Sequence, residues 1–237
     1  MSAKQVIADL KALSSVGKAA ELQRFFKTGP GDYAEGDVFI GVVVPQTRKV
    51  AARYKDLPIT EIAKLTNSDI HEVRLCGLII LTNQFKKSKE VNDRKKLFNF
   101  YLKELKAGHV NNWDLVDVTA PTLGEYLLQL EDPMVVLNKL AKSRSLWERR
   151  VSVVFTFAFL RAGDLEPTYE MAERHLGDKH DLMHKAVGWL LREMGKRDPD
   201  LLRSFLQEYC TEMPRTALRY SIEKFSESER RKWLLAK

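Results

Sequence analysis

Residues 184–191 of the chain read HKAVGWLL, and residues 73–80 (VRLCGLII) and 149–155 (RRVSVVF) repeat the same pattern. In each segment the second position is basic and is followed by small and apolar residues, after a polar or acidic turn. Elsewhere, apolar residues recur at intervals of three and four along most of the chain, which is the period of an α-helix. The sequence therefore predicts a protein made almost wholly of α-helices.

The repeated segments are regularly spaced. Arg74 and Arg150 are 76 positions apart, close to two periods of 38, and Lys185 follows Arg150 after 35 positions. Residues 113–116 (WDLV) fall in the vacant slot between the first two segments. A period of about 35–40 residues made of helix pairs is typical of HEAT and armadillo repeats. We therefore expect an all-α fold, a HEAT-like helical repeat solenoid in which helix pairs form a right-handed stack with a concave basic groove.

Helix boundaries are also visible in the sequence. The signals are Ser-Asp at 68–69, Gly-Asp at 163–164 and 177–178, and Asp-Pro at 198–199. One β-branched run, residues 38–44 (VFIGVVV), could form a strand but has no evident pairing partner. We interpret this run as a short extended or helical segment that leaves the Gly-rich loop 29–37.

The composition is that of a folded protein. Of the 237 residues, 44% are hydrophobic and 30% are charged, which is enough apolar material for a substantial core. No linker or low-complexity segment divides the chain, so we expect a single domain over 1–237. We also expect the protein to be a monomer. The best apolar run, 151–160, is too short and too polar to span a bilayer, and the N-terminal residues 1–13 predict an amphipathic helix rather than a signal peptide. These features predict a cytoplasmic protein with no membrane segment.

The charge of the chain favours a polyanionic partner. Thirty-nine Lys and Arg against 32 Asp and Glu give a net charge of +7, although many basic proteins bind no nucleic acid. If Arg74, Arg150 and Lys185 occupy equivalent positions, they line one side of the groove and could follow a phosphate backbone. The alternative is that these residues are structural and bond the neighbouring turn of each repeat.

The sequence contains no conventional catalytic or metal motif. His180 and His184 have the i,i+4 spacing of zinc ligands, but they lack the glutamate of HExxH and a third ligand, so we interpret them as part of a solvated helix start. Residues 29–31 (GPG) are not followed by the Gly-Lys-Ser/Thr of a phosphate-binding loop, and no GxSxG is present. Cys76 and Cys210 alone provide neither a disulfide framework nor a metal cluster. We expect no metal and no organic cofactor.

Tryptophan residues beside charges mark the candidate site. Trp113 precedes Asp117 by four positions, and Trp189 follows Lys185 by four, so each pair shares one face of a helix. Core packing is the alternative interpretation for any single tryptophan, but an aspartate beside a buried indole needs a partner. An indole face attracts cationic groups, and a carboxylate can stabilise a cationic sugar or position water. This pairing suits hydrolysis of the N-glycosidic bond of an alkylated purine, whose positive charge makes the base a good leaving group.

Four stretches form a recognisable set of motifs: 25–37 (FFKTGPGDYAEGD), 113–117 (WDLVD), 146–150 (LWERR) and 185–193 (KAVGWLLRE). In these motifs, and over nearly its whole length, the chain resembles the DNA alkylation repair glycosylases of the AlkD type, which are built from HEAT-like repeats. The resemblance implies base excision repair, in which positively charged alkylpurines such as 3-methyladenine and 7-methylguanine are removed from double-stranded DNA.

The resemblance also implies roles for individual residues. Asp117 is similar to the catalytic carboxylate of the family, and Trp113 and Trp189 are similar to the indoles that cradle the lesion nucleotide. Arg150 is similar to the groove arginine that holds the DNA backbone. The other residues that we expect at the DNA are Lys185, Arg192, Arg74 and Phe25. Phe25 stands where some members carry a tyrosine, so the hydroxyl contact is absent here.

Together these observations predict a monofunctional DNA glycosylase, a hydrolase that uses water as its nucleophile. Two alternatives stay open. The chain could be a non-catalytic HEAT-like protein that recognises damaged or branched DNA, which a base-release assay distinguishes. It could also be a protein–protein scaffold, whose groove would bind peptides and show little salt-dependent affinity for DNA.

Overall fold

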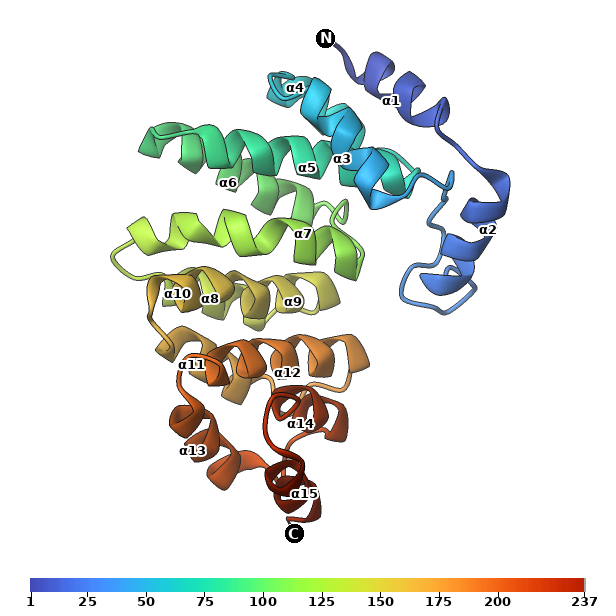
Figure 1. Ribbon diagram of the computed structural model, residues 1–237. Helices are drawn as coiled ribbons and strands as arrows, with labels where there is room; N and C mark the ends of the chain where they lie inside the picture. The colour runs from blue at the N-terminus through green and yellow to red at the C-terminus, as the bar shows by residue number, and fades with distance from the viewer. Residues whose placement is uncertain (237) are drawn as a thin grey trace. The chain divides into compact units, whose positions relative to one another are not determined.

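The computed structural model of the protein describes residues 1–236, in which the regular elements are all helices (Figure 1). In chain order the elements are α1 (Ala3–Lys11), α2 (Val16–Phe25), α3 (Val44–Arg53), α4 (Ile59–Thr66), α5 (His71–Lys87), α6 (Val91–Lys106), α7 (Trp113–Leu123), the 3-10 helix η1 (Gly124–Gln129), α8 (Met134–Ala141), α9 (Leu146–Phe155), α10 (Phe157–Ala162), α11 (Glu166–Arg174), α12 (Asp181–Gly195), α13 (Pro199–Tyr209), α14 (Arg215–Ser221) and α15 (Glu227–Leu235). The run 38–43 before α3 has no regular secondary structure apart from an isolated parallel bridge between Val38 and Ile70. The predicted all-α class is confirmed.

The chain divides into two compact units. The first runs from Met1 to Leu123 and contains α1 to α7, and the second begins at Gly124 and contains η1 and α8 to α15. The single domain expected over 1–237 stays a prediction, as do the handedness of the stack and its concave groove.

The repeated sequence segments occupy packed helices within each unit. Residues 73–80 lie in α5 and residues 113–116 open α7, whereas 149–155 lie in α9 and 184–191 in α12. In the first unit α5 packs against α3, α4 and α7. In the second unit α9 packs against α8 and α12, and α12 packs against α11 and α14. Each helix thus buries its apolar face against its neighbours, as the predicted helical repeat requires.

Glycine in the repeated segments permits this close packing. A Cβ atom on Gly77 of α5 would lie 2.8 Å from the Cβ of Leu65 in α4. A Cβ atom on Gly188 of α12 would lie 2.5 Å from the carbonyl oxygen of Ala217 in α14. Because cores are packed at close to crystal density, no larger side chain fits at either position without moving a helix.

The predicted helix boundaries agree with the structure. Gly163 ends α10 in the left-handed conformation, with φ of 89°. Asp198 caps α13, where its carboxylate accepts hydrogen bonds from the backbone N–H groups of Asp200 and Leu201, and Pro199 occupies the first turn.

The N-terminal residues form the expected amphipathic helix. Ser2 and Gln5 make a capping box at the start of α1, and Val6 and Leu10 are buried. Within residues 1–236, no helix is both long enough and apolar enough to cross a bilayer.

Candidate active site

Trp113 and Asp117 lie one turn apart on α7 of the first unit. Trp113 opens the helix, and both side chains are half-buried. The side-chain oxygen of Asn112 accepts a hydrogen bond from the backbone N–H of Trp113 at 2.8 Å, which satisfies one of the free N–H groups at the start of the helix. The i,i+4 spacing on this helix places the indole and the carboxylate on the same face.

The Trp113 indole belongs to a cluster of aromatic rings. Phe26 stacks on Trp113 with ring centroids 5.3 Å apart and planes 18° from parallel, and Phe25 meets Trp113 edge to face at 6.2 Å. The stack continues from Phe26 to Phe39 at 5.0 Å and from Phe39 to the His71 imidazole at 4.4 Å. Phe25 is 65% exposed, whereas Phe26 is 7% exposed. Phe25 and Trp113 therefore present an aromatic surface to solvent, supported from beneath by the buried rings.

Backbone contacts hold α2, which carries Phe25, although no residue of this helix is buried. The N–H of Ser15 donates to the carbonyl of Ile40 at 2.9 Å. Gly41 packs so closely that a Cβ there would lie 2.2 Å from the carbonyl oxygen of Ser15. At the other end the chain turns at Lys27, whose φ of 53° is left-handed. The contacts of Ser15 with Ile40 and Gly41 therefore fix the start of the helix that presents Phe25.

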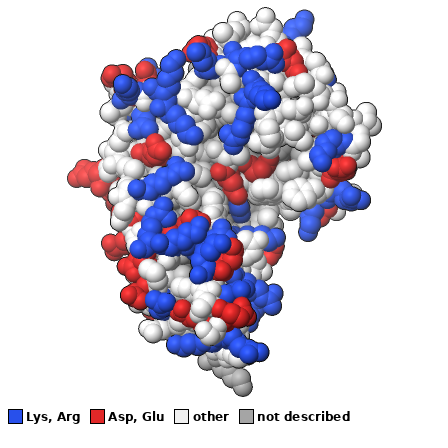
Figure 2. Space-filling model, viewed as in Figure 1, with Lys and Arg blue, Asp and Glu red and all other residues white. Residues whose placement is uncertain are grey.

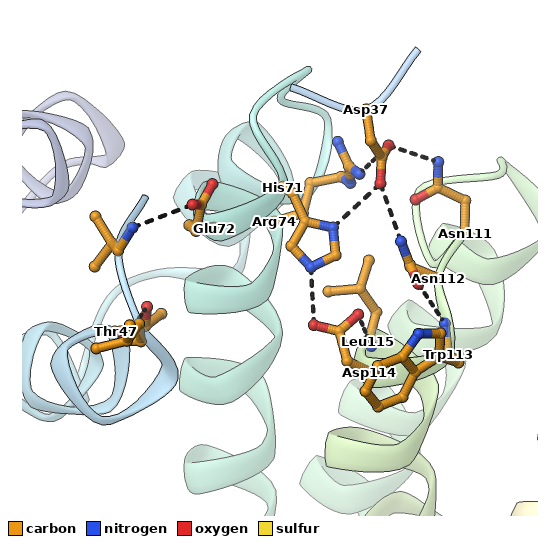
Figure 3. A network of polar contacts seen from close by, with 12 residues as sticks. Asp37, Thr47, His71, Glu72, Arg74, Asn111, Asn112, Trp113, Asp114 and Leu115 are labelled. Carbon is orange, nitrogen blue, oxygen red and sulfur yellow. Dashed lines mark hydrogen bonds and ion pairs between the residues drawn. The ribbon is translucent and has the colours of Figure 1, made fainter. Parts of the chain in front are cut away.

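A buried polar network lies beside Trp113 (Figure 3). The Nδ1 and Nε2 atoms of His71 are 3.1 Å from Oδ2 of Asp37 and 2.8 Å from Oδ2 of Asp114. Arg74 donates to Oδ1 of Asp37 at 2.6 Å, and Asn112 donates to Oδ2 of Asp37 at 3.3 Å. His71, Asp37, Asp114 and Arg74 are all buried.

The charges of this network balance at neutral pH. Burial disfavours the imidazolium form, but the charge of Asp114 and the hydrogen bonds to Asp114 and Asp37 outweigh burial and raise the pKa of His71 to about 9. Burial also favours the neutral form of Asp37, yet the hydrogen bond with His71 and the charge of Arg74 hold the pKa of this carboxyl below its usual value. Two cations thus face two carboxylates.

The sequence patterns did not predict this network. Asp37 and Asp114 lie inside the motifs 25–37 and 113–117, and their place in these motifs is the sequence signal that points to them. His71 carried no such signal, because it lies 34 positions from Asp37 and 43 from Asp114.

Arg74 and Arg150 fit the alternative interpretation, in which these arginines are structural and bond a neighbouring turn. We expected both at the DNA, but each is 4% exposed. Arg74 donates to the carbonyl of Ser68 in the turn before its own helix, as well as to Asp37. Arg150 donates to the carbonyl of Leu182 in α12, which packs against α9. Both guanidinium groups therefore bond neighbouring turns instead of lying on an open surface.

The remaining predicted residues lie on α12 of the second unit. Trp189 is half-buried and packs against Phe157, with ring centroids 5.6 Å apart. Lys185 lies one turn earlier and forms an ion pair with Asp181 at 2.7 Å, and Arg192 forms an ion pair with Glu223. In the view of Figure 2, Lys and Arg side chains lie on both units with Asp and Glu among them.

The two histidines with zinc-like spacing belong to the start of α12. The His180 side chain accepts a hydrogen bond from the N–H of Leu182 and caps the helix. The Nε2 atom of His184 is 2.6 Å from the carbonyl oxygen of Asp178. The interpretation as a helix start is confirmed. In the part of the chain that the structure describes, no three His, Cys, Asp or Glu residues form a group that could hold a metal ion.

The protein is an all-α helical repeat protein with a candidate active site. In this site an indole and a carboxylate share one helix face beside an exposed phenylalanine. The family model described as "DNA alkylation repair enzyme" matches residues 6–225. The chain therefore belongs to the DNA alkylation repair enzyme family, in agreement with its resemblance to the AlkD type.

A solved structure has the same fold. The chain is similar to a "Predicted DNA alkylation repair enzyme from Enterococcus faecalis", with a TM-score of 0.71 and 15% sequence identity over 90% of this chain and 97% of that chain. No curated protein matches the chain. Membership of the family indicates an enzyme with a role in the repair of alkylated DNA.

Proposed function

We propose that the protein is a monofunctional DNA glycosylase that hydrolyses the N-glycosidic bond of cationic alkylpurines, such as 3-methyladenine and 7-methylguanine, in double-stranded DNA. The observation that carries this proposal is the placement of half-buried Trp113 and Asp117 one turn apart on α7, beside the exposed ring of Phe25. Aromatic faces attract a cationic base, and a carboxylate on the same face is suited to a sugar that becomes positive.

The proposed reaction breaks the bond between C1′ of the sugar and the nitrogen of the base. Its electron pair leaves with the base and neutralises the positive charge of the alkylpurine, so no general acid is needed. The sugar becomes cationic and is stabilised by the Asp117 carboxylate. Water then adds to C1′ and transfers its proton to Asp117, which gives the free base and an abasic site. Trp113 holds the cationic base against its indole face before the bond breaks.

The second unit contributes to DNA binding in this proposal. Trp189 serves as a second indole at the lesion nucleotide, and Lys185 and Arg192 serve as phosphate contacts. The burial of Arg74 and Arg150 supports a different role for these two residues, which is to hold the turns that shape the surface. We further propose that the protein acts as a monomer in the cytoplasm and needs neither a metal ion nor an organic cofactor.

The test is a single-turnover series on matched duplexes that contain 3-methyladenine, 7-methylguanine, hypoxanthine or uracil. The two cationic bases should be released in the order of their intrinsic lability. The neutral bases should be released far more slowly, since a general acid contributes about 100- to 10,000-fold and none is assigned here. Comparable rates for uracil and 7-methylguanine would overturn the mechanism. Tight DNA binding with no release of any base would instead support a non-catalytic DNA-binding protein.

A further inference from the structure

A buried histidine that takes no part in the reaction above lies beside Trp113. We propose that His71 is a positioning residue, whose imidazolium ties Asp37 to Asp114 and thereby holds the first turn of α7, with Trp113 and Asp117, against the Phe25–Phe26 turn. The catalytic consequence of this role rests on the proposed function, whereas the structural role does not.

Both nitrogen atoms of the His71 ring face carboxylate oxygens. The contacts are 3.1 Å to Asp37 and 2.8 Å to Asp114, and an ionised carboxylate only accepts hydrogen bonds. A neutral imidazole has one N–H, so it would place a lone pair against one of the two carboxylates. Only the imidazolium donates to both. The titratable groups that face His71 are Asp37 from the loop after α2, Asp114 from α7 and Arg74 from its own helix.

Side chains of the network accept hydrogen bonds from the backbone N–H groups of Trp113 and Leu115. Before it, Asn112 donates from its side-chain nitrogen to Asp37 at 3.3 Å and accepts the N–H of Trp113 at 2.8 Å. After it, Asp114 accepts from His71 and also from the N–H of Leu115 at 2.9 Å. The residue that carries the indole is therefore held between two side chains that meet at the Asp37–His71 pair (Figure 3).

His71 also supports the aromatic side of the site. Its backbone N–H donates to the carbonyl of Val38 at 2.8 Å, and its ring stacks on Phe39 at 4.4 Å. Phe39 stacks on Phe26, which in turn stacks on Trp113. Loss of the imidazolium charge would leave two buried carboxylates with Arg74 as their one cation. Because uncompensated buried charge is costly, Asp37 and Asp114 should then move apart, and each carries one side of the site with it.

The second unit offers a matched control. His175 is also buried, and its Nε2 atom lies 3.0 Å from the Ser152 hydroxyl. Burial lowers the pKa of His175 to about 4, although the charge of Asp178 opposes it, so this ring is neutral at pH 7. His175→Gln therefore removes a buried histidine that does not link two carboxylates, unlike His71.

The experiment uses the full chain with 13C-labelled tryptophan, in which the indole Cδ1–H signal of Trp113, whose proton does not exchange with water at high pH, is assigned by its loss in Trp113→Phe. In the wild-type protein we expect this signal to shift between pH 7 and 10.5 with a midpoint near pH 9. In His71→Gln it should be displaced at every pH and should no longer titrate. The signals of Trp147, Trp189 and Trp233 should not respond to this variant. His175→Gln should leave the Trp113 signal unchanged.

Single-turnover release of 7-methylguanine is measured on the same proteins at pH 7.5, with a no-enzyme control for spontaneous loss. His71→Gln should lower the rate about 100-fold at saturating enzyme, since a misplacement of about 1 Å can cost that much, and should leave the Kd for undamaged duplex unchanged. A Trp113 signal that ignores both pH and His71→Gln overturns the positioning role. If the wild-type protein releases no base, the glycosylase proposal fails, and the indole titration still decides the role of His71.

A second variant covers the case in which His71→Gln does not fold. The double variant His71→Gln/Asp114→Asn leaves Asp37 and Arg74 as a balanced pair, so it restores neutrality without a titratable ring. We expect this protein to fold and its Trp113 signal to be independent of pH. A titration near pH 9 that survives in the double variant would show that another group moves Trp113 and would overturn the proposal.

Discussion

The ring of Phe26 stacks on the indole of Trp113, with centroids 5.3 Å apart and planes 18° from parallel. Phe26 directly follows α2, and Trp113 opens α7, so this contact joins two distant parts of the first unit. The neighbouring residue Phe25 touches the same indole but is 65% exposed, whereas Phe26 is 7% exposed. Adjacent phenylalanines thus have different roles, since one supports the indole and the other faces solvent.

This difference predicts that alanine substitution of Phe26 affects mainly stability, whereas alanine substitution of Phe25 affects mainly DNA binding. Phe26→Ala should lower the free energy of unfolding by about 3–5 kcal/mol, because it leaves a cavity between Phe39 and Trp113. Phe25→Ala should change the free energy of unfolding by less than about 0.5 kcal/mol, yet it should weaken binding to lesion-containing duplex. Urea denaturation and titration with lesion DNA measure the two effects. Equal destabilisation by both variants would contradict the assignment.

Asp117→Asn tests the carboxylate of the proposed reaction. Loss of one electrostatic group aimed at a developing charge costs about 100- to 1000-fold in rate, so the release of 7-methylguanine should fall by that factor while the Kd for undamaged duplex stays the same. Asp93→Asn on the surface of α6 is the control and should release base at the wild-type rate. Wild-type turnover by Asp117→Asn would remove Asp117 from the mechanism.

Arg150 and Lys185 should respond differently to substitution. Arg150→Ala leaves the carbonyl of Leu182 without this donor in a buried site, so it should destabilise the protein by about 1–3 kcal/mol. Lys185→Ala should leave stability nearly unchanged. It should make the slope of log K against log salt for duplex binding less negative by about 0.9, the value for one phosphate contact. If the slope changes for Arg150→Ala and not for Lys185→Ala, Arg150 is the phosphate contact.

The two buried histidines predict opposite pH dependences of stability in the two units. The pKa of His71 is raised from about 6.5 in the unfolded chain to about 9, so its contribution is full below pH 6.5 and is lost as pH rises through 9. A shift of this size corresponds to about 3 kcal/mol. The pKa of His175 is lowered to about 4, so its contribution is full above pH 6.5 and is lost as pH falls through 4.

The first unit should therefore weaken in alkali and the second in acid. Urea unfolding at several pH values, followed by pulsed hydrogen exchange at one fixed labelling pH, measures each unit separately. His71→Gln should remove the loss of stability of the first unit at alkaline pH, and His175→Gln should remove the loss of stability of the second unit at acid pH. If the first unit of His71→Gln still loses stability at alkaline pH, another group causes this loss.

The sequence by itself determined the features that depend on local geometry. The repeated segments predicted stacked helices because an apolar face at a period of 3.6 residues must be buried against a neighbour. Gly163 and Asp198 marked helix ends because the left-handed turn and the cap are chosen by one or two residues. The shared face of Trp113 and Asp117 followed from their spacing of four on one helix.

Only the tertiary structure decided which polar groups meet. The repeated pattern predicted a helix around Arg74, but the burial of its side chain depends on Asp37, which comes from a loop 37 positions earlier. His71 meets Asp37 and Asp114 from two other segments of the chain, and no periodicity relates the three residues. Helix geometry constrains residues within one or two turns of each other. Contacts between segments are selected instead by how helices and loops pack, and buried charges then pair with whichever groups that packing brings within reach.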